Sequence, residues 1–119
     1  MNFIVGSVTT FALDGGSGQG KNPSFNVVTV DKKTLVPIDY ETWWLDLEAA
    51  NRDDNPQWAL KYSYKRDFNL PDLSPKTLAE FAHSLISDEQ TAIKYSDQKM
   101  IGAHPITSCD LSCRRILHC

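Results

Sequence analysis

Three cysteines are the residues of this chain whose type and spacing most clearly suggest chemistry. Cys109, Cys113 and Cys119 all lie in the last eleven residues. An odd number of cysteines leaves one thiol without a partner in the chain if the other two form a disulfide. Residues four apart on a helix have Cα atoms roughly 6 Å apart, a distance that a disulfide can span. Cys109 and Cys113 can therefore bridge if their segment is helical.

Cys119 is the final residue, and we expect its partner to lie further along a longer chain. The alternative is a cytosolic protein with three reduced thiols, which the sequence leaves open. Residues 1–13 lack a positively charged start and a small-residue cleavage site, so we interpret them as a strand and not as a signal peptide. If the cysteines are oxidised, an N-terminal portion is then also expected to be missing. No apolar run approaches the length of a transmembrane helix.

Metal binding and catalysis find little support among the other residues. No two of His83, His104 and His118 stand at the spacing of metal ligands. A zinc site formed by Cys113, His118 and Cys119 is a weaker hypothesis, because adjacent residues chelate one ion poorly and no fourth ligand is evident. No serine or cysteine has a recognisable histidine and carboxylate partner. We therefore predict no catalytic, cofactor-binding or metal-binding residue in this chain.

A glycine-rich segment at residues 15–21 nearly matches a phosphate-binding loop. That motif requires Ser or Thr after its lysine and a helix behind it. Here Lys21 is followed by Asn22 and Pro23, and the next residues have a strand pattern. We interpret the segment as a plain loop. The net charge of −3 gives no reason to expect nucleic acid as a partner.

Four strands are predicted from runs of β-branched and aromatic residues. Residues 3–13 have apolar side chains at both odd and even positions, which is typical of a strand covered on both faces. Residues 24–31 and 35–47 form a predicted hairpin, with Pro37 marking an edge or bulge. Residues 58–64 could form a strand or a short helix, and we favour the strand. A polar connector is expected at residues 51–56.

Three helices are predicted in the second half. Ser74 followed by Pro75 is a typical helix start, and apolar residues then recur at helical spacing. A second helix begins near residues 87–90 and runs to about Lys99. A last short helix, capped by Thr107 or Ser108, carries the cysteines. One group of aromatic residues is expected to serve packing and not ligand binding: Tyr40, Trp43, Trp44, Trp58, Tyr62 and Tyr64.

Several stretches occur together in a distinctive order. They are residues 3–11 (FIVGSVTTF), 22–31 (NPSFNVVTVD), 39–42 (DYET), 45–51 (LDLEAAN), 56–58 (PQW) and 68–75 (FNLPDLSP), followed by the C-terminal cysteines. In this order, over nearly its whole length, the chain resembles the last strands and the C-terminal region of the acid sphingomyelinase family.

The resemblance implies a calcineurin-like metallophosphoesterase that hydrolyses phosphodiester bonds in lipids or nucleotides with two zinc ions. The family's metal ligands precede the region matched here, so no catalytic residue is carried over. The resemblance also implies that Cys109 pairs with Cys113, that Cys119 pairs with a cysteine beyond this terminus, and that the protein is secreted or lysosomal.

The resulting prediction is an α+β fold: three C-terminal strands of a metallophosphoesterase sheet in residues 1–48, then a helical, disulfide-bearing subdomain in residues 49–119. Its expected role is structural, completing and covering a catalytic portion that precedes it. Phospholipid or nucleotide phosphodiester substrates would be met only in the complete enzyme. The alternative is an independent secreted module that binds lipid or protein through its tryptophans.

Overall fold

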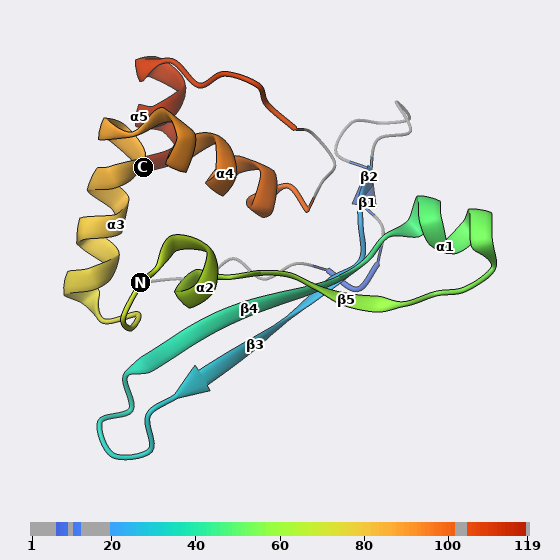
Figure 1. The fold of residues 1–119 in the computed structure, drawn as a ribbon, viewed down its shortest axis with the longest axis horizontal. Coiled ribbons are helices and arrows are strands. Elements are labelled where there is room, and N and C mark those ends of the chain that lie inside the picture. The colour runs from blue at the N-terminus through green and yellow to red at the C-terminus, as the bar shows by residue number, and fades with distance from the viewer. Residues whose placement is uncertain (1–6, 10, 13–19, 102–104, 119) are drawn as a thin grey trace.

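The computed structural model describes residues 7–9, 11–12, 20–101 and 105–118. A three-stranded antiparallel sheet in the order β3-β4-β5 is followed mainly by helices (Figure 1). The strands are β3 (Ser24–Val30), β4 (Pro37–Leu45) and β5 (Trp58–Ser63). Two short strands, β1 (Phe11–Ala12) and β2 (Gly20–Lys21), pair with each other. This arrangement confirms the predicted α+β class.

The composition of the sheet differs from the prediction. The predicted hairpin is present as β3 and β4, and the register shifts where Val30 meets Pro37, as the proline suggested. The third strand is β5, which pairs with β4 on the side away from β3. Most of the strand predicted at residues 3–13 lies outside the described residues, and residues 7–9 are not in a strand. Ser7 nevertheless contacts the sheet, because its carbonyl oxygen accepts a hydrogen bond of 2.9 Å from the Ser24 N–H.

A β-bulge in β5 divides the sheet's aromatic residues between its two faces. Thr42 of β4 pairs with Tyr62, but the next residue, Trp43, pairs with Leu60, so Lys61 is the extra residue. Tyr62 and Leu60 are two apart in sequence and would share a face in a regular strand. The bulge instead places Tyr62 on the face of Tyr40 and Thr42, and Leu60 on the face of Trp43.

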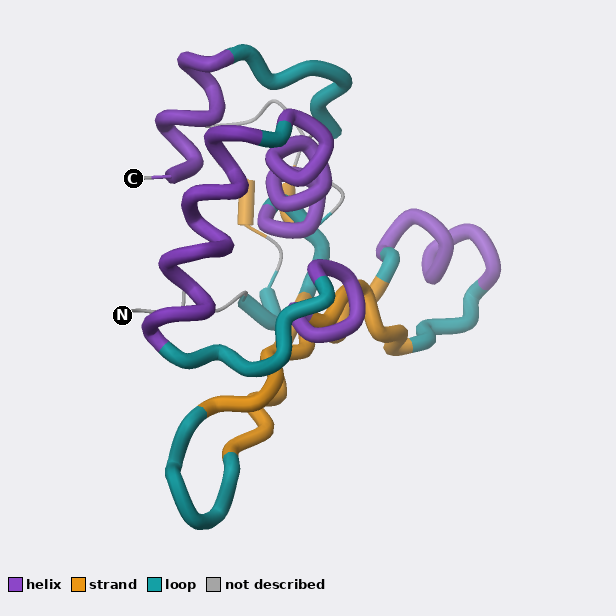
Figure 2. Tube along the Cα trace, turned by 60° about the vertical axis from the view of Figure 1, so that its left-hand side comes forward, coloured by secondary structure: helices purple, strands orange, loops and turns teal. Residues whose placement is uncertain are grey.

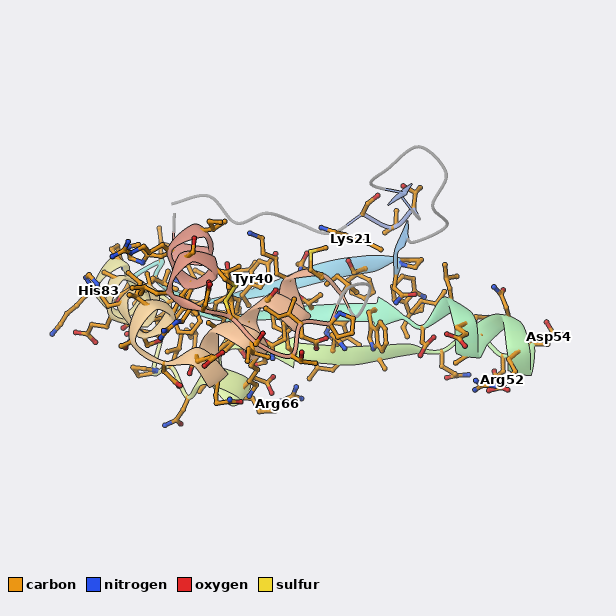
Figure 3. All side chains as sticks on the ribbon, turned by 90° about the horizontal axis from the view of Figure 1, so that it is seen from above. Lys21, Tyr40, Arg52, Asp54, Arg66 and His83 are labelled. Atoms are coloured by element: carbon orange, nitrogen blue, oxygen red, sulfur yellow. A yellow bond between two sulfur atoms is a disulfide. The ribbon has the colours of Figure 1, made fainter. Side chains whose placement is uncertain are left out.

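Two short helices were not predicted. Helix α1 (Leu47–Asp53) begins where the predicted strand was expected to end, because the Asp46 carboxylate caps it by accepting from the Ala49 N–H. Helix α2 (Tyr64–Phe68) directly follows β5, and Ser63 caps it through the Arg66 N–H. Helix α1, with Arg52 and Asp54, lies at the opposite end of the molecule from His83 of α3 (Figure 3).

The three predicted helices are α3 (Pro75–Ser87), α4 (Glu89–Lys99) and α5 (Leu111–His118). Ser74 caps α3 as expected, and Asp88 caps α4. The cap expected for α5 was wrong. Asp110, and not Thr107 or Ser108, accepts from the Cys113 N–H and, through its main-chain oxygen, from the Arg114 N–H. An aspartate at this point competes well with the earlier hydroxyls for the free N–H groups of the first turn.

The core lies between one face of the sheet and the helices. Tyr40, Leu73 and Leu78 are buried together, with Leu70 and Tyr64 packed against them. Rings from α2, α3 and α4 extend this core: Tyr64, Phe68, Phe81 and Tyr95 form a chain of contacts with centroid distances between 4.6 and 6.4 Å. Burial raises the pKa of Tyr40 to about 12, with smaller contributions from Tyr62 and Tyr95. The Tyr40 phenol therefore stays neutral at physiological pH.

Candidate interaction surface

The second face of the sheet carries a cluster of aromatic side chains. Phe25, Trp43 and Leu60 are cross-strand neighbours, and Leu45 is paired with Trp58. The rings of Phe25 and Trp43 are nearly parallel, with centroids 6.4 Å apart, and Phe25 lies 5.1 Å from Trp58. We call this set the aromatic face: Phe25, Val27, Trp43, Leu45, Trp58 and Leu60.

Three of the six residues of the aromatic face are exposed, and the other three are half-buried. Phe25 is 37% exposed, Val27 40% and Trp58 44%. Tyr40, Thr42 and Tyr62 on the opposite face are each buried under the helices. Large rings contribute most of the energy at buried interfaces, and contiguous exposed apolar side chains commonly mark an interaction site. The aromatic face is therefore the strongest candidate for a binding surface among the described residues.

The predicted role of the aromatic residues as packing groups holds for only part of the set. Tyr40, Tyr62 and Tyr64 pack beneath the helices. Trp43 and Trp58 belong to the aromatic face. Trp44 lies on the helix side, where the Lys61 ammonium is 4.5 Å from its ring centroid in a cation–π contact. Alternation along β4 separates Trp43 from Tyr40 and Trp44, but the bulge that separates Trp58 from Tyr62 has no obvious signal in the residue pattern.

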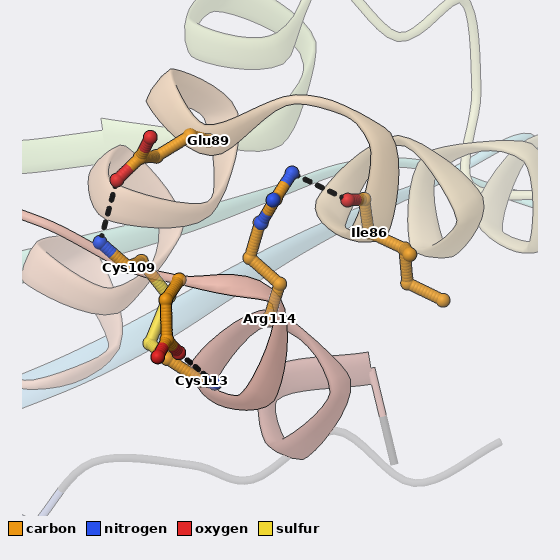
Figure 4. The surroundings of a disulfide bond; sticks show 6 residues. Ile86, Glu89, Cys109, Cys113 and Arg114 are labelled. Atoms are coloured by element: carbon orange, nitrogen blue, oxygen red, sulfur yellow. Dashed lines mark hydrogen bonds between the residues drawn. A yellow bond between two sulfur atoms is a disulfide. The ribbon is translucent and has the colours of Figure 1, made fainter.

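The disulfide joins Cys109 and Cys113, with Cα atoms 5.2 Å apart (Figure 4). Cys109 lies just before α5 and is almost fully buried, and its N–H donates to the Glu89 carboxylate of α4 at 2.9 Å. Arg114 of α5 donates to the carbonyl oxygen of Ile86 in α3 at 2.7 Å. Together these contacts fix the start of α5 against both neighbouring helices.

The structure also bears on the zinc hypothesis. The Cys113 sulfur is bonded to Cys109 and is not a free thiolate, while His104 and Cys119 lie outside the described residues. The rings of His118 and His83 are tilted against each other with centroids 5.7 Å apart, and the His118 Nδ1 is 2.9 Å from the Ala82 carbonyl oxygen. No group of three or more potential metal ligands occurs in the part of the chain that the structure describes.

A shallow groove of ≈ 660 Å³ lies between α2, α3 and α4, with Phe68 and Phe81 among its lining residues. Lys94 spans it, because its ammonium lies 5.4 Å from the Phe68 ring centroid and 3.6 Å from the Asp67 carboxylate. Partial burial favours the neutral form of Asp67, but hydrogen bonds from Arg66 and the Ser63 N–H outweigh it and lower the pKa of Asp67. Asp67 and Lys94, two charged residues of the groove, are thus already paired with each other.

The remaining sequence features are less informative in three dimensions. Residues 13–19 of the glycine-rich segment lie outside the described residues, and Gly20 and Lys21 form β2. Within the described ranges, none of the helices has the length and hydrophobicity needed to cross a bilayer.

The family of this chain follows from comparison with known proteins. The family model described as the acid sphingomyelin phosphodiesterase C-terminal region matches residues 2–119. The chain therefore belongs to this family, in its C-terminal region.

Curated relatives include sphingomyelin phosphodiesterase B of Dictyostelium discoideum, 38% identical over 58% of this chain and 10% of the relative. Sphingomyelin phosphodiesterase 1 of Caenorhabditis elegans is 29% identical over 95% of this chain and 19% of the relative. The human cyclic GMP-AMP phosphodiesterase SMPDL3A is 26% identical over 85% of this chain and 22% of the relative. The chain thus spans at most about a quarter of the length of the relatives it matches.

Proposed function

We propose that residues 1–119 act as the C-terminal portion of a sphingomyelinase-like phosphodiesterase, with a structural role. The aromatic face carries this proposal. Its apolar side chains are only partly covered, in a chain whose relatives are several times longer. A catalytic portion that precedes this region in such an enzyme is the partner that would cover Phe25, Trp43 and Trp58. Burial of these rings would then hold the two portions together.

The reaction itself belongs, in this proposal, to the preceding portion. The complete enzyme would hydrolyse a phospholipid or nucleotide phosphodiester, as the relatives' names suggest. In this proposal it would do so as a metallophosphoesterase with two zinc ions. Residues 1–119 would contribute no catalytic, cofactor-binding or metal-binding side chain. Purified 1–119 supplied with zinc should therefore hydrolyse neither sphingomyelin nor cyclic GMP-AMP. Zinc-dependent turnover of either compound by this chain would contradict the proposal.

We further propose a secreted or lysosomal location, which the disulfide supports because such bonds persist in oxidising compartments. The division into terminal strands at residues 1–48 and a helical subdomain at 49–119 also remains a proposal. Strand β5 pairs with β4 across that boundary, so the two parts share one sheet.

A chimera tests the docking role directly. Residues 2–119 would replace the corresponding region of the Caenorhabditis elegans sphingomyelin phosphodiesterase 1, and secreted yield and activity would be measured. Trp58→Ser should lower the yield of folded chimera at least tenfold, because a buried interface tryptophan contributes about 2 kcal/mol or more. Leu111→Ser is the matched control, since Leu111 is 45% exposed but lies on α5.

Two outcomes would decide against the proposal. Equal yields for Trp58→Ser and Leu111→Ser would show that the aromatic face is not covered in the enzyme. A cooperative melt and a monomeric state for 1–119 alone, with its aromatic face stable in water, would favour the alternative of an independent module. A docked portion should instead self-associate when isolated, through the same face.

A further inference from the structure

The connection between β3 and β4 projects from the body of the molecule. In Figure 1 and Figure 2 this hairpin points away from α3, α4 and α5. We call residues 31–36 the hairpin tip. Lys32, Lys33, Thr34 and Leu35 are all exposed there, and Leu35 is 74% exposed.

The hairpin tip is preformed by its own hydrogen bonds. The Asp31 Oδ1 accepts from the Lys33 N–H, the Thr34 N–H and the Thr34 hydroxyl, at 2.7 to 2.9 Å. The Asp31 N–H donates to the Val36 carbonyl oxygen, and the Leu35 N–H donates to the Asp31 carbonyl oxygen. The bonds from Thr34 and Lys33 lower the pKa of Asp31 and keep its carboxylate charged within the turn. A turn fixed in this way loses little further entropy when it binds a surface.

Leu35 is unusual in two independent ways. Its φ of 57° lies in the left-handed region, which is unfavourable for a residue with a Cβ and is commonly occupied by glycine. Its large apolar side chain is also displayed to water. Strain held in a well-ordered turn is a recognised sign of functional constraint. A glycine would remove both disadvantages, so the leucine side chain itself is expected to have a use.

The charges at the hairpin tip indicate what it contacts. Lys32 and Lys33 are adjacent cations in a chain whose net charge is −3. The carboxylate of Asp31, the residue before them, is engaged by the turn. Val28 and Val30, 45% and 43% exposed, continue the apolar surface along β3. Exposed lysines beside an apolar side chain match the interface of an anionic bilayer, where ammonium groups meet lipid phosphates and leucine enters the acyl boundary.

We propose that the hairpin tip is a contact site for anionic phospholipid membranes. It is separate from the docking role, because Val28 and Val30 have the opposite strand parity to Phe25 and Val27 of the aromatic face. A protein covering the aromatic face would therefore leave the hairpin tip available to a membrane.

Vesicle flotation of the full 119-residue chain tests this proposal, because protein that has only self-associated does not float with the vesicles. Vesicles of phosphatidylcholine alone are compared with vesicles that also contain phosphatidylserine. We expect binding only to the second, weakening as salt rises. Lys32→Glu with Lys33→Glu should weaken binding about 25-fold, since each lysine near an anionic surface contributes about fivefold. Leu35→Gly should weaken binding about tenfold while leaving the melting temperature unchanged or higher.

The matched control is Lys65→Glu with Lys76→Glu, which makes the same charge change on exposed lysines of α2 and α3. This control should bind within about twofold of the unchanged chain. Equal losses of vesicle binding in the control and hairpin-tip variants would overturn the proposal. Equal binding to vesicles with and without phosphatidylserine would also overturn it. So would hairpin-tip variants that bind vesicles normally but lower the yield of the chimera, because the tip would then contact protein. The hairpin-tip variants should keep the chimera's yield, which separates this test from that of the aromatic face.

Discussion

The side-chain amide of Asn22 donates a hydrogen bond of 3.1 Å to the carbonyl oxygen of Ile101, a residue 79 positions away. The Asn22 Oδ1 also accepts from the Leu47 N–H at 3.2 Å. One side chain thus connects the start of the sheet, the first turn of α1 and the end of α4. Both bonds are partly buried, so water replaces them poorly if the amide is removed.

Asn22→Ala should lower the free energy of unfolding by about 2 kcal/mol, the sum of two partly buried hydrogen bonds. Urea unfolding followed by circular dichroism would measure the change. Asn55→Ala is the control, because Asn55 is exposed and its side chain accepts a hydrogen bond from the nearby Gln57. A loss for Asn22→Ala no larger than that of the control would show that Asn22 does not connect these elements.

The Cys109–Cys113 disulfide should add only modest stability. Its loop is short, and loop-closure entropy then corresponds to about 2 kcal/mol. Reductant should lower the free energy of unfolding of the unchanged chain by that amount. The double variant Cys109→Ser with Cys113→Ser should show the lower value with or without reductant. If reductant leaves the free energy of unfolding of the unchanged chain as it was, the disulfide is absent in solution.

Phe81 should be more important to the isolated chain than Phe25. Phe81 is buried and touches Tyr64, Phe68 and Tyr95, so Phe81→Ala should lower the free energy of unfolding by about 3–5 kcal/mol. Phe81→Leu, at about 1.5 kcal/mol, remains measurable if the alanine variant does not fold. Phe25→Ala should change the isolated chain by less than about 1 kcal/mol, yet impair the chimera. A larger loss of stability for Phe25→Ala than for Phe81→Ala in the isolated chain would contradict the assignment of the two faces.

Acid should destabilise the chain partly through the cap of α4. The Asp88 carboxylate accepts from the Thr91 hydroxyl and the Gln90 N–H, and these bonds lower the pKa of Asp88 below its usual 3.8. A carboxyl with a lowered pKa in the folded state stabilises the fold above pH 3.8, and this contribution disappears as the pH falls through the folded pKa.

The urea midpoint should therefore hold steady from neutral pH to about pH 5 and fall below pH 4. Asp88→Asn keeps a capping side chain but removes the titrating group, so its midpoint should decline less steeply in acid. Glu48→Gln provides a control at another acidic residue in the first turn of a helix. If the urea midpoint of Asp88→Asn falls as steeply in acid as that of the unchanged chain, Asp88 does not contribute to the acid sensitivity.

The sequence was most informative where local chemistry decides structure. Ser74 and Pro75 predicted the start of α3 because capping depends on neighbouring residues alone. The strands of the β3–β4 hairpin were also predictable from their composition. Asp46 could have indicated α1, but the apolar run before it extended the predicted strand past its true end.

Features that depend on distant contacts were not predictable from one sequence. Lys61 looks like any polar residue in an alternating strand, yet its bulge places Tyr62 and Leu60 on opposite faces of the sheet. The aromatic residues therefore appeared to be a single packing group. The sheet position of β5 likewise depends on tertiary pairing with β4, which sequence periodicity does not report.

The bulge at Lys61 has a consequence for how this region can change over generations. Exchanging one amino acid for another between Trp58 and Ser63 alters a single contact. Adding one codon there, with the bulge retained, would turn the indole of Trp58 and the phenol of Tyr62 toward the same side of the sheet. This stretch should accordingly tolerate the loss of one residue, which would only remove the bulge, better than the gain of one.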